Sequence, residues 1–155
     1  MNIIRRIRSF DWFSALIAAP FAVVLAWVVT AALDREPPIR HDSARALADS
    51  VEAGGAIGVE FNVFRERICP AEVRRWLYDS AWNRHAIPSW TTGLELLAGR
   101  EVYQRTITIP LAAQPGPAQY QVELDYECRL IQRILRWPVR VYSPPIKFTI
   151  AEGPP

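Results

Sequence analysis

The pattern of apolar and polar residues divides the chain at Asp34. From Trp12 to Leu33 the sequence reads WFSALIAAPFAVVLAWVVTAAL and contains no ionisable side chain. At about 1.5 Å of rise per residue this run spans roughly 33 Å as a helix, which matches the ~30 Å hydrocarbon core of a bilayer. Backbone groups in hydrocarbon must bond one another. The pattern therefore predicts a transmembrane helix over residues 12–33, bent at Pro20.

Charge next to the apolar run predicts its orientation. Arg5, Arg6 and Arg8 precede the run, accompanied by Asp11. The positive-inside rule then gives a cytoplasmic tail over residues 1–11 in a bacterial inner membrane and a periplasmic C-terminal domain. The alternative is a cleaved signal peptide, for which Thr30-Ala31-Ala32 offers small residues. The apolar run exceeds the usual 7–15 residues of such a peptide, which favours an uncleaved anchor.

Residues 34–54 are interpreted as a linker that contains a short amphipathic helix. Pro37-Pro38 predicts an extended exit from the membrane. Four apolar residues then follow at i, i+3, i+4 and i+7, namely Ala44, Leu47, Ala48 and Val51. This spacing predicts a helix over about 43–53 that ends at Gly54-Gly55 and serves as a stalk or packs against the following domain.

From Ala56 the period of the apolar residues changes to two. The clearest alternation lies in residues 119–128, where five polar residues separate Tyr120, Val122, Leu124, Tyr126 and Cys128. Similar short runs, divided by turn signals such as Pro115-Gly116-Pro117, occur along the rest of the chain. They predict an all-β ectodomain, an antiparallel β-sandwich over residues 55–150, with a C-terminal tail over 151–155.

Composition narrows the function classes. Beyond Asp11 the chain carries equal numbers of acidic and basic residues, so we expect no nucleic-acid partner.

The chain holds two cysteines, Cys69 and Cys128. In an oxidising compartment such a pair is expected to form a disulfide.

The cysteines and their neighbours resemble the immunoglobulin-like fold. Cys69 and Cys128 have the spacing of its two sheet-bridging cysteines, and Tyr126-Glu127-Cys128 resembles its tyrosine corner. The resemblance implies a core tryptophan near Trp82, with Trp76 or Trp90 as alternatives. The layout is also similar to that of small single-pass bacterial and phage membrane proteins.

Catalytic and metal chemistry has little support in the sequence. His41 and His85 lack partners at metal-ligand spacing, and we expect no cofactor. Asp79, Ser80 and His85 supply the residue types of a hydrolytic triad, but no nucleophile-elbow motif accompanies them. Asp79-Ser80 is interpreted as part of a hairpin turn.

Two segments are candidate contact surfaces. The first combines arginines and tryptophans, which are enriched at binding hot spots: Arg74, Arg75, Trp76, Trp82, Arg84 and Trp90. The alternative is that these are core and rim residues. The second segment is the apolar loop Arg129–Trp137, which would contact the membrane or a partner if it lies outside the core.

These observations favour a non-catalytic, bitopic membrane protein. Its ectodomain is expected to bind a protein in the membrane or periplasm, as an accessory or structural subunit of a membrane complex, and a homo-oligomer is compatible with this hypothesis. The alternative is a phage-encoded envelope effector, either a lysis accessory or a superinfection-exclusion factor. An enzyme that uses Asp79, Ser80 and His85 is the third hypothesis.

Overall fold

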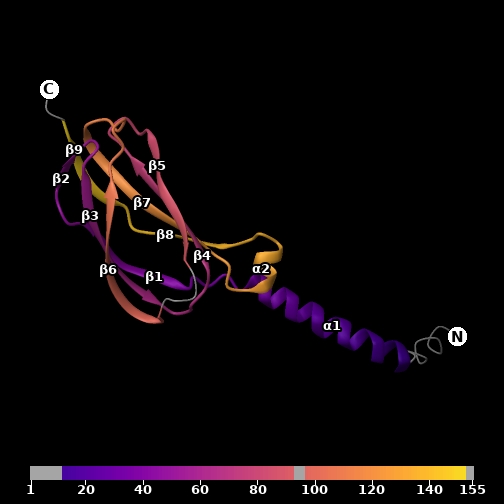
Figure 1. Ribbon diagram of the computed structural model, residues 1–155. Helices are drawn as coiled ribbons and strands as arrows, with labels where there is room; N and C mark the ends of the chain where they lie inside the picture. The colour runs from indigo at the N-terminus through magenta and orange to yellow at the C-terminus, as the bar shows by residue number, and fades with distance from the viewer. Residues whose placement is uncertain (1–11, 93–96, 153–155) are drawn as a thin grey trace, which may run out of the picture. The chain divides into compact units, whose positions relative to one another are not determined.

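A computed structural model describes residues 12–92 and 97–152 of the chain (Figure 1). The predicted tail over 1–11, the segment 93–96 and the last three residues lie outside this described part. The chain forms two compact units, one through Arg35 and one from Glu36 onward. The elements are α1 (Trp12–Leu33), β1 (Ile39–Ala46), β2 (Ser50–Glu52), β3 (Ala56–Arg65), β4 (Ala71–Tyr78), β5 (Arg84–Thr92), β6 (Gly99–Thr108), β7 (Gly116–Tyr126), α2 (Leu130–Ile134), β8 (Val139–Tyr142) and β9 (Ile146–Ala151).

The first unit contains the apolar helix α1, with the bounds that the sequence predicts and with Pro20 inside it. Within the described residues it is the one helix long and apolar enough to cross a membrane. Its side chains from Ala15 onward are largely exposed. A signal sequence near the N-terminus can meet the same criterion.

The second unit is a β-sandwich of two sheets. One sheet has three strands in the order β1-β3-β6, and the other has the order β2-β9-β7-β4-β5, with β8 also paired to β7. The strand pairs are antiparallel except β2 with β9, which run parallel. The structure thus confirms the predicted β-rich domain and corrects its purely antiparallel description.

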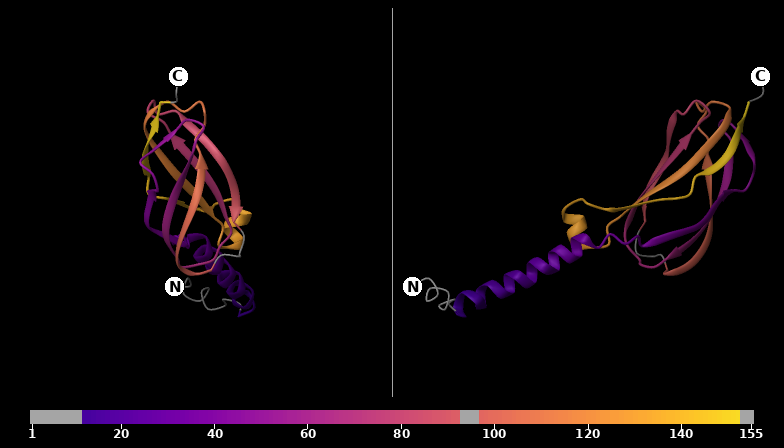
Figure 2. Two further views of the ribbon diagram at one scale, coloured as in Figure 1. Left: turned by 60° about the vertical axis from the view of Figure 1, so that its left-hand side comes forward. Right: turned by 180° about the vertical axis from the view of Figure 1, so that it is seen from behind.

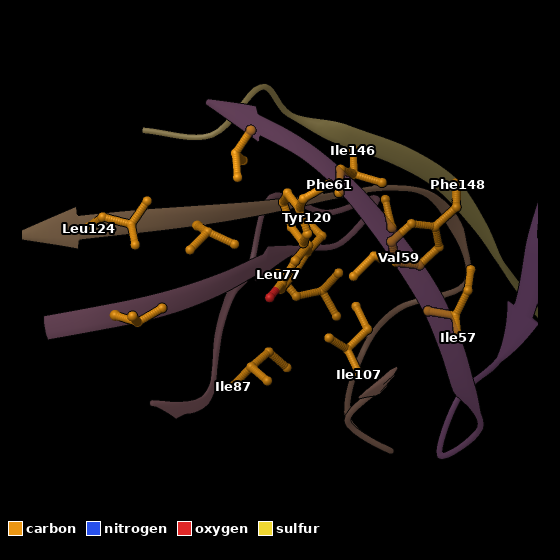
Figure 3. Packing of buried hydrophobic residues seen from close by; sticks show 14 of the residues in the cluster. Ile57, Val59, Phe61, Leu77, Ile87, Ile107, Tyr120, Leu124, Ile146 and Phe148 are labelled. Atoms are coloured by element: carbon orange, nitrogen blue, oxygen red, sulfur yellow. The ribbon is translucent and has the colours of Figure 1, made fainter. Parts of the chain in front are cut away.

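The core lies between the two sheets. Inward residues of β3, such as Val59 and Phe61, meet Leu77 of β4, Tyr120 of β7 and Ile146 of β9 (Figure 3). The alternation read from the sequence decides which side chains enter this layer, because successive residues of a strand point to opposite faces. Burial of large apolar side chains such as Leu77 contributes about 2 kcal/mol each.

The helix predicted over 43–53 is wrong, because this segment forms β1 and β2. Strand β1 pairs with β3 along its length, and the register shifts between His41 and Ser43. The apolar residues at helix-like spacing belong to different segments, since Ala44 lies in β1 whereas Leu47 and Ala48 lie in the bend that follows it. Val51 lies in β2 and pairs with Ile150 of β9. Long-range backbone pairing overrides the local pattern here.

The predicted linker over 34–54 is corrected for the same reason. The compact unit begins at Glu36, and Ile39 already belongs to the core. The sandwich therefore starts well before residue 55. The sandwich also ends one residue later than the predicted residue 150, since Ala151 is the last residue of β9.

A disulfide joins Cys69 and Cys128, as predicted, with their Cα atoms 4.8 Å apart. Cys69 lies between β3 and β4, and Cys128 follows β7. The bond thus closes one end of the sandwich beside the backbone hydrogen bond from Glu127 N to Pro70 O, at 3.1 Å. Tyr126 is buried, and this burial raises the pKa of its hydroxyl.

The core tryptophan implied by the immunoglobulin-like resemblance is not at Trp82. This residue is 75% exposed at the tip of the β4–β5 hairpin, where it adopts a φ of 62°. Trp76 is half-buried and belongs to the outward set of β4, and the side chain of Trp90 lies outside the described part of the structure.

The hairpin that carries Trp82 is organised by the buried carboxylate of Asp79. Its oxygens accept hydrogen bonds from the backbone N–H groups of Ala81, Asn83 and Gln114, at 2.9–3.1 Å, and contact Nε2 of His85 at 2.9 Å. Burial by itself raises the carboxyl pKa. The hydrogen bonds from His85, Gln114 and Asn83 outweigh it and hold the pKa of Asp79 below its usual range.

Removal of the disulfide should destabilise the sandwich. The bond closes a loop with a sequence separation of 59, for which the chain-entropy model gives about 4 kcal/mol. We expect the free energy of unfolding of the Cys69→Ala/Cys128→Ala variant to be lower by this amount. The variant should therefore unfold at a lower urea concentration, as measured by circular dichroism of the full chain in detergent. Wild-type protein treated with reductant is the matched control and should behave like the variant. Unchanged midpoints in both samples would contradict this expectation.

Replacement of Asp79 by Asn should loosen the hairpin. Asn keeps the shape but has one acceptor oxygen, so we expect a loss of about 2–3 kcal/mol in the free energy of unfolding. Because the folded pKa of Asp79 lies below the unfolded value, its contribution is complete above about pH 4 and declines as the pH falls further.

The difference in urea midpoint between wild type and Asp79→Asn should therefore shrink as the pH is lowered below 4. Ser80→Ala, in the same turn, is the control and should leave a pH-independent difference. A wild-type-like midpoint for Asp79→Asn at neutral pH would refute the role given to this carboxylate.

Candidate functional site

The outward side chains of the six-stranded sheet form the candidate site. Strand β4 buries Ala71, Val73 and Leu77 against the core, so its alternate residues point to the opposite face. The register with β7 sets Arg74 beside Glu123, and Trp76 beside Gln121. We call this surface the Arg-Trp face. It consists of Glu72, Arg74, Trp76, Arg84, Glu123, Asp125 and Arg140.

Two arginines and three carboxylates form an ion-pair network on the Arg-Trp face. Arg74 donates to Glu72 through two N–H groups at 3.0 and 3.1 Å and lies 3.2 Å from Asp125. Arg140 makes a two-pronged contact with Asp125 at 2.7 and 3.0 Å and also reaches Glu123 at 3.0 Å. The side chain of Asp125 is only 7% exposed. The network therefore fixes both guanidinium groups in place.

The electrostatics of both arginines follow from these contacts. The hydrogen bond to Glu72 is the largest cause that raises the pKa of Arg74. For Arg140 the hydrogen bond to Asp125 is the largest cause that raises the pKa. Both groups keep their charge at all accessible pH values. The carboxylates of the network thus compensate the positive charge of both arginines.

Aromatic side chains adjoin the network. The guanidinium of Arg84 lies over the indole ring of Trp76, with its carbon 4.4 Å from the ring centroid, and Trp76 Nε1 approaches Glu123 Oε2 at 3.4 Å. Towards the hairpin tip, the rings of Tyr78 and Trp82 are 6.4 Å apart. A cation–π stack of this kind orders both partners and leaves a flat surface available for contact.

The structure brings together three of the six predicted contact residues. Arg74, Trp76 and Arg84 share the Arg-Trp face, and Trp82 is exposed nearby at the hairpin tip. Arg75 does not belong to this face. Its Nε donates to the carbonyl of Pro88 at 2.8 Å, and its side chain also bonds the buried hydroxyl of Tyr120. The side chain of Trp90 is not described.

The sequence analysis did not predict four members of the face, namely Glu72, Glu123, Asp125 and Arg140. The alternation around Tyr120 did indicate that Glu123 and Asp125 point outward. Nothing local showed that Arg140 would lie opposite Asp125, because that register arises from the pairing of β8 with β7.

A hollow of about 660 Å³ continues from the network towards α2. Its lining includes Arg74 and Asp125 of the network together with Glu127, Arg133 and Arg136. Both charge signs line it. It therefore suits a partner that presents both acidic and basic groups rather than one highly charged polymer.

The residues of the hypothetical triad, Asp79, Ser80 and His85, make separate contacts in and around the β4–β5 hairpin. His85 contacts Asp79, whereas the hydroxyl of Ser80 donates to the carbonyl of Pro115 at 2.6 Å. A nucleophilic serine requires its hydroxyl to face the histidine. Within the described ranges, no group of three or more His, Cys, Asp or Glu side chains is arranged to hold a metal ion.

Comparisons with known proteins do not place the chain in a family. No protein-family model matches it, and no curated protein matches its sequence. Among solved structures, it is similar to the alkylpurine DNA glycosylase AlkC of Pseudomonas fluorescens bound to DNA containing an abasic site analog, with 11% identity and a TM-score of 0.46 over 74% of this chain and 30% of that one.

Two further solved structures show a similar likeness. For the sporulation control protein Spo0M of Bacillus subtilis the identity is 13% and the TM-score 0.40, over 77% of this chain and 51% of that one. For a PapD-like domain of human CEP192 the identity is 8% and the TM-score 0.37, over 77% and 91%. The chain thus spans about half or less of the first two proteins, and likenesses this distant carry no argument about activity or partner.

Proposed function

We propose that this chain is a single-pass membrane protein whose extracytoplasmic, immunoglobulin-like domain binds another protein through the Arg-Trp face. In this role it is a non-catalytic accessory or structural subunit of a membrane complex. The observation that carries the proposal is the stack of Arg84 on Trp76 beside the ion-pair network.

The assignment of a membrane anchor is based on α1. Its uncharged run is longer than the apolar region of an ordinary signal peptide, and three arginines precede it. The disulfide between Cys69 and Cys128 suits an oxidising space such as the periplasm. Together these features support an inner-membrane protein with a cytoplasmic N-terminus and a periplasmic sandwich.

The immunoglobulin-like assignment rests on the closed end of the sandwich. The disulfide has the expected cysteine spacing, and Tyr126 is buried two residues before the second cysteine. The exposed position of Trp82 departs from that pattern, so the likeness concerns architecture rather than ancestry.

The binding role follows from the energetics of the face. Arginine and tryptophan dominate binding hot spots because they bury a large area and make directed polar contacts. Here the guanidinium groups of Arg74 and Arg140 are already held by carboxylates, so little side-chain entropy remains to be lost on association. The charges also compensate one another, which favours a protein surface over nucleic acid.

A photo-crosslinking experiment tests this assignment. A photoreactive amino acid in place of Trp82, in the full chain in its native membrane, should give one dominant adduct with a second protein. The further change Trp76→Ala should greatly reduce this adduct, because loss of a hot-spot tryptophan costs about 2 kcal/mol, or roughly 30-fold in Kd.

The control carries the photoreactive residue at Thr106, on the exposed outer face of the three-stranded sheet. It should not give this adduct. Equal adducts at Trp82 and Thr106, or an adduct unaffected by Trp76→Ala, would exclude the Arg-Trp face as the binding surface.

A further inference from the structure

The loop that contains α2 has an inverted distribution of polar and apolar side chains. Gln132 is 2% exposed, and its Oε1 accepts hydrogen bonds from the backbone N–H groups of Cys128 and Arg129, both at 3.0 Å. The large apolar side chains of the same loop are exposed instead: Leu130 (65%), Ile134 (66%), Leu135 (55%) and Trp137 (46%). In a loop surrounded by water the opposite distribution is expected.

This exposure is built into the loop. The side chain of Gln132 ties down its start, and the backbone N–H of Trp137 donates to the carbonyl of Gln132 at 2.8 Å, which closes its end. The adjacent Cys128 is fixed by the disulfide. The apolar side chains are thus held outward by a network of directed bonds.

The loop lies at the end of the sandwich where the chain enters from α1. Ile39 of β1 pairs with Arg65 at the end of β3, and the short segment 66–70 leads from there to β4. The first residue of β4, Ala71, pairs with Tyr126 at the end of β7. The short helix α2, in orange, follows this end of β7 (Figure 2).

Two more exposed apolar residues, Ile68 and Leu97, lie at this same end, since they precede β4 and β6. We call this surface the α2 end. It is defined by Ile68, Leu97, Leu130, Ile134, Leu135 and Trp137. Over half of the exposed large apolar residues described in the sandwich thus gather where the chain enters it.

Basic residues are interspersed with these apolar ones. Arg129, Arg133 and Arg136 lie within the loop and are exposed. Arg133 lies 3.8 Å from Glu127. Tryptophan and arginine beside exposed leucine and isoleucine are typical of a protein surface that enters the interface of an anionic membrane.

We propose that the α2 end is a second membrane contact, which inserts its apolar side chains among the acyl chains and places its arginines at anionic headgroups. This inference rests on the membrane anchor of the proposed function. Only residues 34–38 separate the end of α1 from Ile39, and five extended residues cover at most about 18 Å. In the proposed topology, this short linker keeps Ile39 within reach of the bilayer surface.

A spin-label experiment tests the contact. In the full chain, with its native disulfide oxidised, a nitroxide is attached at Ile134→Cys and, in a control variant, at Leu111→Cys. Leu111 is an exposed leucine between β6 and β7, at the opposite end of the sandwich. Both chains are reconstituted into phosphatidylcholine vesicles with and without phosphatidylglycerol.

We expect the label at Ile134 to collide several-fold less often with a water-soluble nickel complex than the label at Leu111, and more often with oxygen. Removal of phosphatidylglycerol, or the change Arg133→Gln/Arg136→Gln, should move the Ile134 label towards water. Equal nickel accessibility at both sites would overturn the proposal, and insensitivity to headgroup charge would overturn the role of the arginines.

Two further outcomes separate the alternatives. Protection of the Ile134 label that disappears when the protein is diluted in excess lipid would indicate a second copy of the chain instead of lipid, and would overturn the proposal. Extraction of the chain by alkaline carbonate would overturn the anchor and this inference with it. A carbonate-resistant chain with a water-exposed Ile134 label would overturn the inference alone.

Discussion

The antiparallel pairing of β4 with β7 is the constraint on which both faces of the six-stranded sheet depend. Its register buries Leu77 beside Tyr120 and, three residues along, sets Arg74 beside Glu123 on the outer face. A shift of one residue would exchange the two faces. The core and the Arg-Trp face are therefore two consequences of one register, which the buried side chains enforce.

The closed end of the sandwich links this register to the rest of the chain. Cys128 lies two residues beyond the end of β7, and its bond to Cys69 holds the start of β4 beside the start of the α2 loop. Gln132 then fixes the loop, with Leu130, Ile134 and Leu135 exposed. In the proposed arrangement the α2 end faces the lipid surface and the Arg-Trp face stays available at the side of the domain.

Much of this architecture follows from alternation within single strands. Residues 119–128 show their buried and exposed sides in the sequence alone, and the disulfide was predictable because the chain contains two cysteines and its sequence predicts an oxidising compartment. The helix prediction over residues 43–53 failed because apolar residues of two short strands and of the bend between them fall by coincidence at helix-like spacing. The partner of Asp125 was not predictable either, because Arg140 reaches it through a pairing of distant strands. Local patterns thus predicted which residues point outward, whereas tertiary pairing decides which of them meet.

The most direct measurement of the central claim, that the Arg-Trp face binds a protein, is stoichiometric co-purification of the full chain from its native membrane. The account predicts one partner near unit ratio with wild type, its loss with Arg84→Ala/Trp76→Ala, and its retention with Thr106→Ala on the other sheet. A partner retained by the Arg84→Ala/Trp76→Ala variant, or absent from wild type, would contradict the account.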